Sequence, residues 1–141
     1  KLPILMYHNV SNLKNTSKGL TISEENLEAQ FCYLVENNYK TYHFSELQKL
    51  SEIPKNSVVI TFDDVTENQL LYAVPLLKKY DLKASFFIAF AYLGKTDLWN
   101  DGIEKIMSIE QLKSIDNQLV EFGFHSFSHA KYTNLTSDEI Q

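Results

Sequence analysis

The sequence has little cysteine, glycine or proline and lacks a long hydrophobic run. Its 141 residues include a single cysteine, Cys32, with four glycines and three prolines. One cysteine cannot form an intrachain disulfide or a cysteine-based zinc site, so we expect Cys32 to be a small buried residue on an apolar helix face. The longest apolar runs, residues 58–62 and residues 84–93 with one serine inside, fall far short of the ~18 residues that cross a bilayer. We therefore expect no membrane-spanning segment in this chain.

Basic residues are also scarce. Lysine and arginine total 13 against 18 aspartates and glutamates, which gives a formal net charge of −5 and a pI near 5.3. Without a positive field or a basic run, the chain offers nothing that would attract a phosphate backbone, and we expect no nucleic-acid partner. With 44% hydrophobic residues the chain can bury a core without disulfides or metal staples. We expect one domain over residues 1–141, and a monomer.

Apolar strand-like runs alternate with helical patterns along the chain. Strands are predicted at residues 2–7, 39–43, 58–62, 83–90 and 119–124. Helices are predicted at residues 21–38, 45–50, 68–80 and 108–118. Residues 8–19 are mostly polar and are predicted to form a loop. This alternation predicts an α/β fold with a parallel sheet of right-handed βαβ units, either open or part of a barrel.

Helix starts are marked by capping residues. Capping-box spacing relates Thr21 to Glu24, Ser108 to Gln111 and Thr136 to Glu139, and Ser45 alone can cap a short helix. The first helix carries an apolar stripe, which consists of Leu27, Phe31, Leu34 and Val35. An eight-fold barrel needs at least ~200 residues, whereas about five strands are predicted here and the last helix has scarcely begun at Gln141. We therefore expect a distorted, barrel-like (β/α) domain that is incomplete at its C-terminal end.

Acids and histidines follow three of the predicted strands. His8 follows the first strand, Asp63 and Asp64 follow residues 58–62, and His125 and His129 follow residues 119–124. Because the carboxyl ends of parallel strands meet at one edge, these side chains should share one rim.

Two histidines four residues apart could lie on one side of a helical turn and hold a divalent ion. A carboxylate from Asp63 or Asp64 would complete a catalytic set with open positions. Such an ion lowers the pKa of its water and polarises a carbonyl, while the neighbouring aspartate could take the proton. The plainer alternatives are a chance histidine pair and acids that cap the next helix.

These residues resemble carbohydrate esterase family 4, the polysaccharide deacetylases that share the NodB homology domain. Residues 61–65, Thr-Phe-Asp-Asp-Val, are similar to the first motif of that family, Thr-Phe-Asp-Asp-Gly. Residues 125–129, His-Ser-Phe-Ser-His, resemble the second motif, His-Ser/Thr-x-x-His. Residues 75–80 and 83–87 are also similar to the helix and strand between the motifs, so the resemblance covers most of residues 57–135.

The resemblance implies a role for each matched residue. Asp63 would be the general base, and Asp64, His125 and His129 would hold a divalent metal, with Zn first and Co, Ni or Fe as alternatives. Met-Tyr-His at residues 6–8 resembles the N-terminal motif of a circularly permuted subgroup similar to poly-N-acetylglucosamine deacetylases. There His8 would be the general acid, and its plainer reading is a strand-end histidine bonded to a nearby carbonyl.

The implied reaction is hydrolysis of N-acetyl groups from a polysaccharide or glycan, with release of acetate, in an extracytoplasmic location. Two departures favour an alternative, a carbohydrate-binding domain with impaired turnover. Val65 replaces the glycine of the family, and a β-branched residue resists positive φ. The third motif, which lends an oxyanion-stabilising backbone N–H, has no counterpart before Gln141. A different metal hydrolase that cleaves a peptide or small amide is a third hypothesis.

Two further side chains have alternative interpretations. Trp99, with Tyr92 nearby, could stack on a sugar ring or pack over the core. His43 is predicted to be structural.

Overall fold

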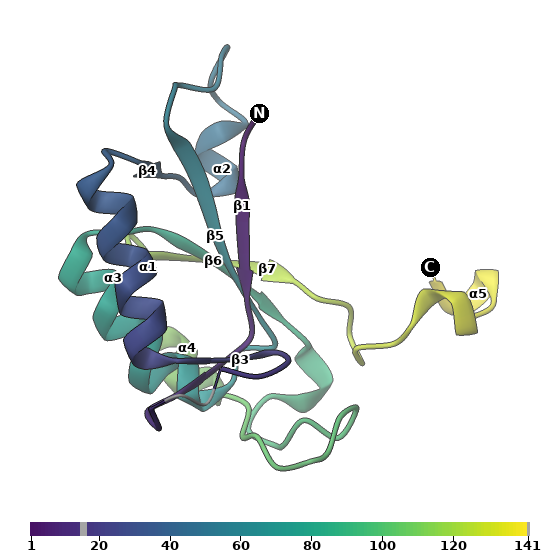
Figure 1. Ribbon diagram of the computed structural model, residues 1–141. Helices are drawn as coiled ribbons and strands as arrows, with labels where there is room; N and C mark the ends of the chain where they lie inside the picture. The colour runs from purple at the N-terminus through teal and green to yellow at the C-terminus, as the bar shows by residue number, and fades with distance from the viewer. Residues whose placement is uncertain (15–16, 141) are drawn as a thin grey trace.

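The computed structural model contains a parallel β-sheet at its centre (Figure 1). Within the residues that it describes, 1–14 and 17–140, five strands form this sheet: β1 (Ile4–Tyr7), β4 (Lys40–Thr41), β5 (Ser57–Asp63), β6 (Ala84–Ile88) and β7 (Val120–Phe124). The order is β1-β5-β6-β7, every pair is parallel, and β4 pairs with the start of β5. The predicted α/β class with a parallel sheet is confirmed, and all five predicted strands are present.

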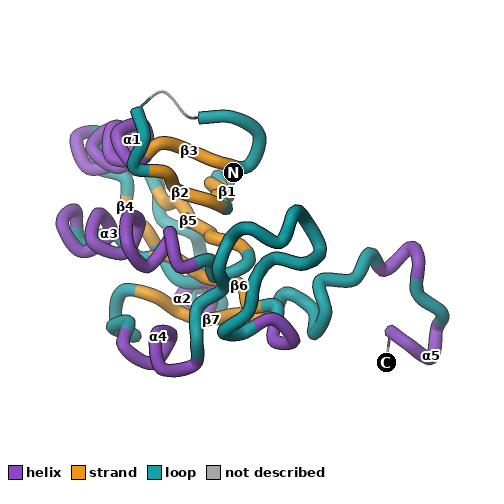
Figure 2. The backbone as a smooth tube through the Cα atoms, turned by 90° about the horizontal axis from the view of Figure 1, so that it is seen from below, coloured by secondary structure: helices purple, strands orange, loops and turns teal. Residues whose placement is uncertain are grey.

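Helices join the strands and cover the sheet. The longer ones are α1 (Glu24–Glu36), α3 (Val74–Tyr80) and α4 (Ile109–Ser114). Helices α1 and α3 lie side by side on one face of the sheet (Figures 1 and 2). The short helical segments are α2 (Phe44–Leu47), the π-helix η1 (Gln69–Ala73), the 3₁₀ turns η2 (Phe90–Tyr92) and η3 (Tyr132–Asn134), and α5 (Ser137–Ile140). Figure 2 shows α5 apart from the body of the molecule.

An aromatic row crosses the helix-covered face of the sheet. Strand register places Tyr7, Phe62, Phe86 and Phe122 next to one another on successive strands. Their ring centroids are 5.2, 4.9 and 6.4 Å apart in that order, and Tyr7 also contacts Phe31 of α1. Since successive strand residues face opposite sides, the residues one position further along each strand face away from α1 and α3. His8 and Asp63 belong to that next row.

One glycine in that next row is required by a close approach. Gly123 of β7 lies beside Phe87 of β6, and a Cβ atom at Gly123 would lie 2.6 Å from the Phe87 ring. Real Cβ contacts are never that short, so the ring can occupy this position only because residue 123 has no side chain.

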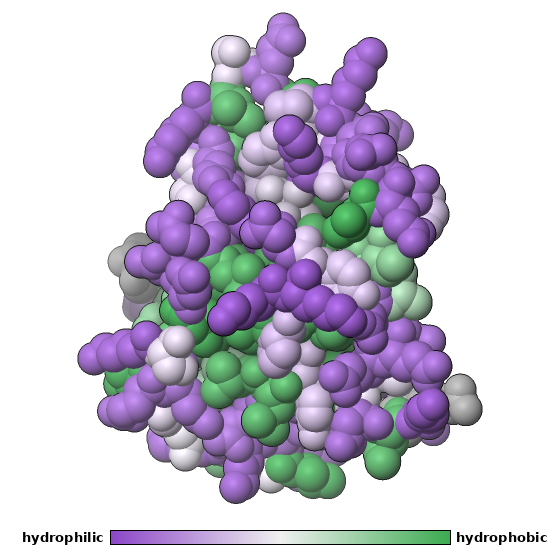
Figure 3. Space-filling model, turned by 90° about the vertical axis from the view of Figure 1, so that its left-hand side faces the viewer, coloured by the Kyte–Doolittle hydropathy of each residue, from purple (hydrophilic) through white to green (hydrophobic). Residues whose placement is uncertain are grey.

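Figure 3 shows the opposite, helix-covered side of the molecule, where hydrophilic side chains predominate and hydrophobic ones appear between them.

The predicted loop at residues 8–19 is wrong in part. Strand β2 (Asn9–Ser11) pairs in parallel with β3 (Thr21–Ser23), and together they form a separate two-stranded sheet. Because Thr21 belongs to β3, it does not begin the first helix as predicted. Ser23 is the N-cap instead, and its Oγ accepts a hydrogen bond from the Asn26 N–H. Residues 15 and 16 lie outside the described residues.

Other helix details also differ from the prediction. His43, not Ser45, precedes α2, and the Glu46 carboxylate accepts a hydrogen bond from the His43 N–H. The helix predicted at residues 68–80 begins as a π-helix, and α4 ends at Ser114 rather than at residue 118 because Ile115 is extended. Val35 is exposed and Cys32 is half-buried, so the prediction that both are buried on the apolar face of the helix is wrong. Confirmed features are the burial of the other three stripe residues and the Ser108–Gln111 capping box.

Among residues 1–14 and 17–140, no helix combines the length and the apolar character that a membrane crossing requires.

Candidate metal centre

Chemically active side chains gather at the carboxyl edge of the sheet. His8 follows β1, Asp63 ends β5 and is followed by Asp64, and His125 follows β7. His129 lies four residues further along the loop after β7. The three strands run parallel, so their ends meet at one edge, and all five predicted site residues lie there.

Strand register brings His8 and Asp63 together. Tyr7 of β1 is the register partner of Phe62 in β5, so the next residues, His8 and Asp63, are also opposite each other. His8 Nε2 lies 3.6 Å from Asp63 Oδ2, and each side chain is only 14% exposed. The sheet itself therefore brings an imidazole and a carboxyl group together, although α1 and β4 lie between the two strands in the chain.

A buried glutamine ties these two residues to each other. Gln69 has no solvent exposure, and its Nε2 donates hydrogen bonds to the main-chain carbonyls of His8 (2.9 Å) and Asp63 (2.6 Å). Its Oε1 is buried without a hydrogen-bond partner among the described residues. Gln69 is the first residue of η1, a helix type that occurs often at functional sites. Gln69 is not among the site residues predicted from the sequence, because a glutamine at the start of a helix gives no sign that it reaches two strands.

Backbone hydrogen bonds and a strained turn position Asp64. The Asp64 N–H donates to the Phe87 carbonyl at 3.0 Å, which extends the ladder between β5 and β6 by one residue. The chain then turns through left-handed conformations at Asp64 (φ 76°) and Val65 (φ 49°). Val65 is fully buried, and its carbonyl accepts a hydrogen bond from the Met107 N–H. Val65 therefore adopts the positive φ that a β-branched residue resists. The backbone is strained there, at a cost of roughly 1–3 kcal/mol.

The two histidines reach the centre from an irregular loop. The His125 N–H donates to the Ile88 carbonyl at 2.9 Å, which continues the β6–β7 ladder. Residues 125–129 then form no helix, and both Ser126 (φ 56°) and His129 (φ 53°) are left-handed. The helical turn predicted for this pair is therefore wrong. The loop reverses direction instead, and the two imidazoles meet edge-on with ring centroids 4.9 Å apart.

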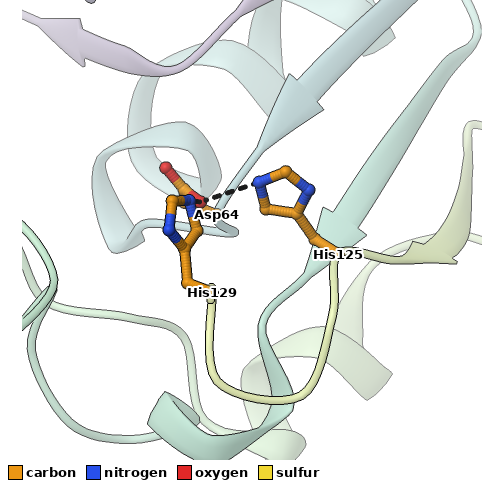
Figure 4. Close-up of side chains that lie close together, drawn as sticks. All are labelled: Asp64, His125 and His129. Carbon is orange, nitrogen blue, oxygen red and sulfur yellow. Dashed lines mark ion pairs between the residues drawn. The ribbon is translucent and has the colours of Figure 1, made fainter. Parts of the chain in front are cut away.

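Asp64, His125 and His129 form a compact set of ligand atoms (Figure 4). Asp64 Oδ1 lies 3.5 Å from His125 Nε2 and 3.2 Å from His129 Nε2, and one ligand atom from each residue lies within 4.8 Å of the others. Bond lengths of about 2.0–2.2 Å around zinc place neighbouring ligands roughly 3.3 Å apart. The set is thus close to the size that a small divalent cation requires.

The polar atom at the centre of this set has no hydrogen bond. Asp64 Oδ1 is buried, and neither nearby imidazole nitrogen meets it with hydrogen-bond geometry. Burial raises the pKa of the Asp64 carboxyl, although His129, His125 and His8 act to lower it. A buried, unsatisfied oxygen between two imidazole nitrogens fits a cation, which would satisfy all three groups at once.

Trp99 covers one face of a candidate ligand. Its indole stacks on the His129 imidazole, with ring centroids 4.5 Å apart and planes 12° from parallel. Tyr92 meets Trp99 edge-on at 4.7 Å, and Trp99 also packs against the core. Packing is thus observed for Trp99, and it is directed at the metal centre. His43, expected to be structural, is buried with Nε2 3.1 Å from the Leu119 carbonyl.

An acidic cleft of about 350 Å³ opens beside the centre. Its lining joins His8, Asp64, His129 and Trp99 to Asn9, Leu20, Thr21, Thr66, Asp97, Asn100, Asp101 and Glu104, and includes no lysine or arginine from the described residues.

Asn68 holds the segments around the cleft together. It accepts from the Val10 N–H and donates to Asn9 Oδ1 and Glu104 Oε2. Its connecting role was also missed from the sequence, since it depends on segments far apart in the chain.

Comparison with known proteins agrees with this geometry. A family model described as polysaccharide deacetylase matches residues 51–141. YxkH of Bacillus subtilis, a polysaccharide deacetylase by name, is 32% identical over 145 residues, which cover 100% of this chain and 48% of that protein. A Staphylococcus aureus poly-β-1,6-N-acetyl-D-glucosamine N-deacetylase is 30% identical over 112 residues, or 77% of this chain and 38% of that protein.

A solved structure shows the same arrangement of elements. The Streptococcus pyogenes deacetylase PplD in complex with acetate superposes with a TM-score of 0.79 at 25% identity, over 97% of this chain and 61% of that chain. With 48% and 38% of the two curated relatives covered, this chain spans about half of their length or less. The family resemblance and the barrel-like (β/α) fold expected from the sequence are both confirmed, with the sheet forming part of a barrel.

Proposed function

The chain belongs to the polysaccharide deacetylase family, and on that premise we propose that it hydrolyses N-acetyl groups of a carbohydrate with a divalent metal ion bound by Asp64, His125 and His129. One observation carries the proposal. The buried Asp64 Oδ1 has no hydrogen bond although two imidazole nitrogens lie within 3.5 Å of it. Two neutral histidines and one carboxylate that leave positions open are typical of catalytic metal sites.

Each residue has a distinct task in the proposed reaction. A divalent ion bound at this centre supplies Lewis-acid polarisation of the acetyl carbonyl and lowers the pKa of water. Asp63, beside Asp64 but outside the ligand set, accepts the proton of the attacking water as general base. His8 donates a proton to the amine nitrogen as the C–N bond breaks, so acetate and a free amino sugar leave. His8 Nε2 and Asp63 Oδ2 lie 3.6 Å apart, which supports the proposal because one acetamido group is large enough to reach both.

The substrate is an N-acetylated polysaccharide or glycan in this proposal. The S. aureus relative is named for poly-β-1,6-N-acetyl-D-glucosamine, and the S. pyogenes structure holds acetate, the second product of such a reaction. The cleft of about 350 Å³ beside His8 and Asp64 gives the sugar a place to bind. We assign zinc as the preferred ion, with Co, Ni or Fe as alternatives, because the histidine–carboxylate set accepts them all.

The same proposal extends to the setting of the protein. It acts as a monomer in an extracytoplasmic location, where polymers of N-acetylated sugars occur.

A second candidate function is sugar binding with impaired turnover. It is favoured by the strained Val65, which replaces a glycine directly after the two aspartates. This candidate predicts that sugar binds and no acetate is released, whereas a peptide or small-amide hydrolase would release a different product.

Calorimetric titration of the metal-free protein with Zn²⁺ near pH 7.5 tests the proposal. We expect one ion per chain in the wild type and no measurable binding in Asp64→Ala or His125→Ala. Acetate release from N-acetylglucosamine oligomers is then measured on the zinc-loaded protein. His43→Ala serves as the histidine control, because His43 is distant from the centre and should leave zinc binding intact.

The outcomes separate the candidates. Zinc binding that is indifferent to both ligand substitutions, in proteins with native circular dichroism, would sink the metal-centre proposal. Zinc and sugar binding without acetate release would favour the second candidate.

A further inference from the structure

Among the described residues, no hydrogen-bond partner orients the ring of His129. Its Nε2 faces Asp64, so Nδ1 is the nitrogen left for an outer contact. Ligating histidines commonly donate this second N–H to a carboxylate or carbonyl, which sets the ring orientation. Within residues 1–14 and 17–140, no such group hydrogen-bonds to the His129 ring. The backbone adds little support, because His129 is left-handed and its N–H makes no hydrogen bond to a described residue.

The contact that His129 does make is with an aromatic ring. The Trp99 indole lies parallel to the imidazole within 12° at a centroid distance of 4.5 Å. Trp99 comes from the long segment between β6 and α4, far from His129 in sequence, and Tyr92 packs edge-on against it. Residues around Trp99 are themselves held firmly, since Asp97 is buried and its carboxylate accepts hydrogen bonds from the Glu104 N–H and the Asn100 side chain.

We propose that Trp99 is a positioning residue for the metal centre, which holds the His129 imidazole by stacking where other sites use a hydrogen bond. The inference rests on the proposed function, because it requires that His129 bind the ion. A flat indole restricts both the tilt and the rotation of the imidazole, so Nε2 is kept aimed at Asp64.

The same contact should favour the metal-bound state. Coordination draws electron density from an imidazole and makes the ring more positive. A positive ring is attracted to the negative face of an indole, so the stacking strengthens when the ion binds. Trp99 therefore raises metal affinity without touching the ion.

Variants at Trp99 test this inference through zinc affinity, measured by competition with a chelator. Trp99→Phe keeps an aromatic face, and we expect its affinity to stay close to that of the wild type. Trp99→Leu keeps apolar volume without a ring face, and we expect a loss of about 10-fold or more, the scale of outer-contact effects in metal sites. The matched control is Phe90→Leu, which removes an aromatic contact with Phe124 at 5.7 Å and keeps the stack of Trp99 on His129.

Fluorescence gives a second readout that needs no variant. Trp99 is the single tryptophan of the sequence, so intrinsic emission reports on this ring alone. We expect Zn²⁺ to change the emission with the same midpoint as in calorimetry, and Co²⁺ to quench it at the same stoichiometry.

The possible results distinguish this inference from the proposed function. If the wild type binds no zinc, the metal-centre proposal fails and takes the inference with it. If the wild type binds zinc while its emission does not change, or if a folded Trp99→Leu variant binds zinc as tightly as Phe90→Leu, the positioning role is wrong and the metal centre stands. Affinity lost in Trp99→Leu and kept in Trp99→Phe supports the inference.

Discussion

The candidate metal centre has two sides. His8, Asp63 and Asp64 form its acid side, which the sheet holds in place. Residues 125–129 form its histidine side, which is a loop. On the acid side, strand register and Gln69 fix two residues, and a ladder hydrogen bond fixes the third. On the histidine side, ladder contact ends at His125, and beyond it the loop has one backbone hydrogen bond, from the Ala91 N–H to the Phe127 carbonyl, and ring contacts of His129 with Trp99 and His125. The acid side is thus preformed by the sheet, whereas the proposals above make the histidine side depend on Trp99 and on the ion.

The largest effect should separate chemistry from metal binding. Asp63→Asn removes the proposed general base and leaves all three ligands, so acetate release should fall ~10²–10⁴-fold while zinc affinity stays unchanged. His129→Asn removes a proposed ligand, so its zinc affinity should fall by more than the ~10–100-fold that loss of an outer contact costs. The two are compared by calorimetry and an acetate assay. Loss of zinc binding in Asp63→Asn would show that the two aspartates do not have separate roles.

The next effect concerns the rigidity of the acid side. Gln69→Met removes both donors to the His8 and Asp63 carbonyls, and each buried carbonyl left unpaired costs about 1–3 kcal/mol. Loss of the unpaired Oε1 offsets part of this, so we expect about 2–3 kcal/mol lower stability in urea denaturation, lower kcat and similar zinc affinity. The exposed Gln118→Met is the control, expected within about 0.5 kcal/mol of wild type. Equal stability in both variants would contradict a bracing role for Gln69.

The next effect concerns the Glu121 carboxylate, which anchors strand β7 ahead of the histidine loop. Glu121 of β7 accepts hydrogen bonds from Ser85 Oγ and from the N–H groups of Phe44 and Ser45. Burial alone would raise the pKa of the Glu121 carboxyl, but these hydrogen bonds lower it overall from the ordinary value of 4.5. Because the folded pKa is depressed, this stabilisation is present above pH 4.5 and is lost as pH falls through the folded pKa.

Glu121→Gln should therefore cost about 1–2 kcal/mol at pH 7, and its difference from the wild type should shrink below about pH 4.5. Urea denaturation at a series of pH values measures both. The exposed Glu52→Gln should show no such pH-dependent difference. A Glu121→Gln deficit that persists undiminished in acid would show that charge is not what anchors β7.

The smallest effect is the difference in mobility between the two sides. Amide hydrogen exchange should be slow at Asp64, whose N–H is bonded to Phe87, and fast at residues 127–129, whose N–H groups have no hydrogen bond to a described residue. Zinc at about ten times its Kd should slow exchange in the loop by about tenfold through linkage. Equal protection of the two segments without metal would show that the acid side and the histidine side do not differ in mobility.

Sequence patterns predicted the frame of the molecule well, and local details less well. Continuous β-branched runs identified the buried strand β5, and alternation with helices predicted a parallel sheet. Competing partners explain the errors: Thr21 joined β3, so Ser23 became the cap of α1, and residues 9–11 found a strand partner in a segment that looked like a loop. Such choices depend on which segments meet in space, which local patterns do not encode.

For the site itself, the sequence alone determined which residue types are available and at which strand ends they stand. Five chemically active residues could be named because parallel strands bring their carboxyl ends to one edge. Only the tertiary structure decided how they meet: the register that pairs His8 with Asp63, the Gln69 bridge, the non-helical loop of His125 and His129, and the stacking of Trp99. Each of these joins residues distant in the chain, and distances across a fold are set by packing and register, which are properties of the whole domain.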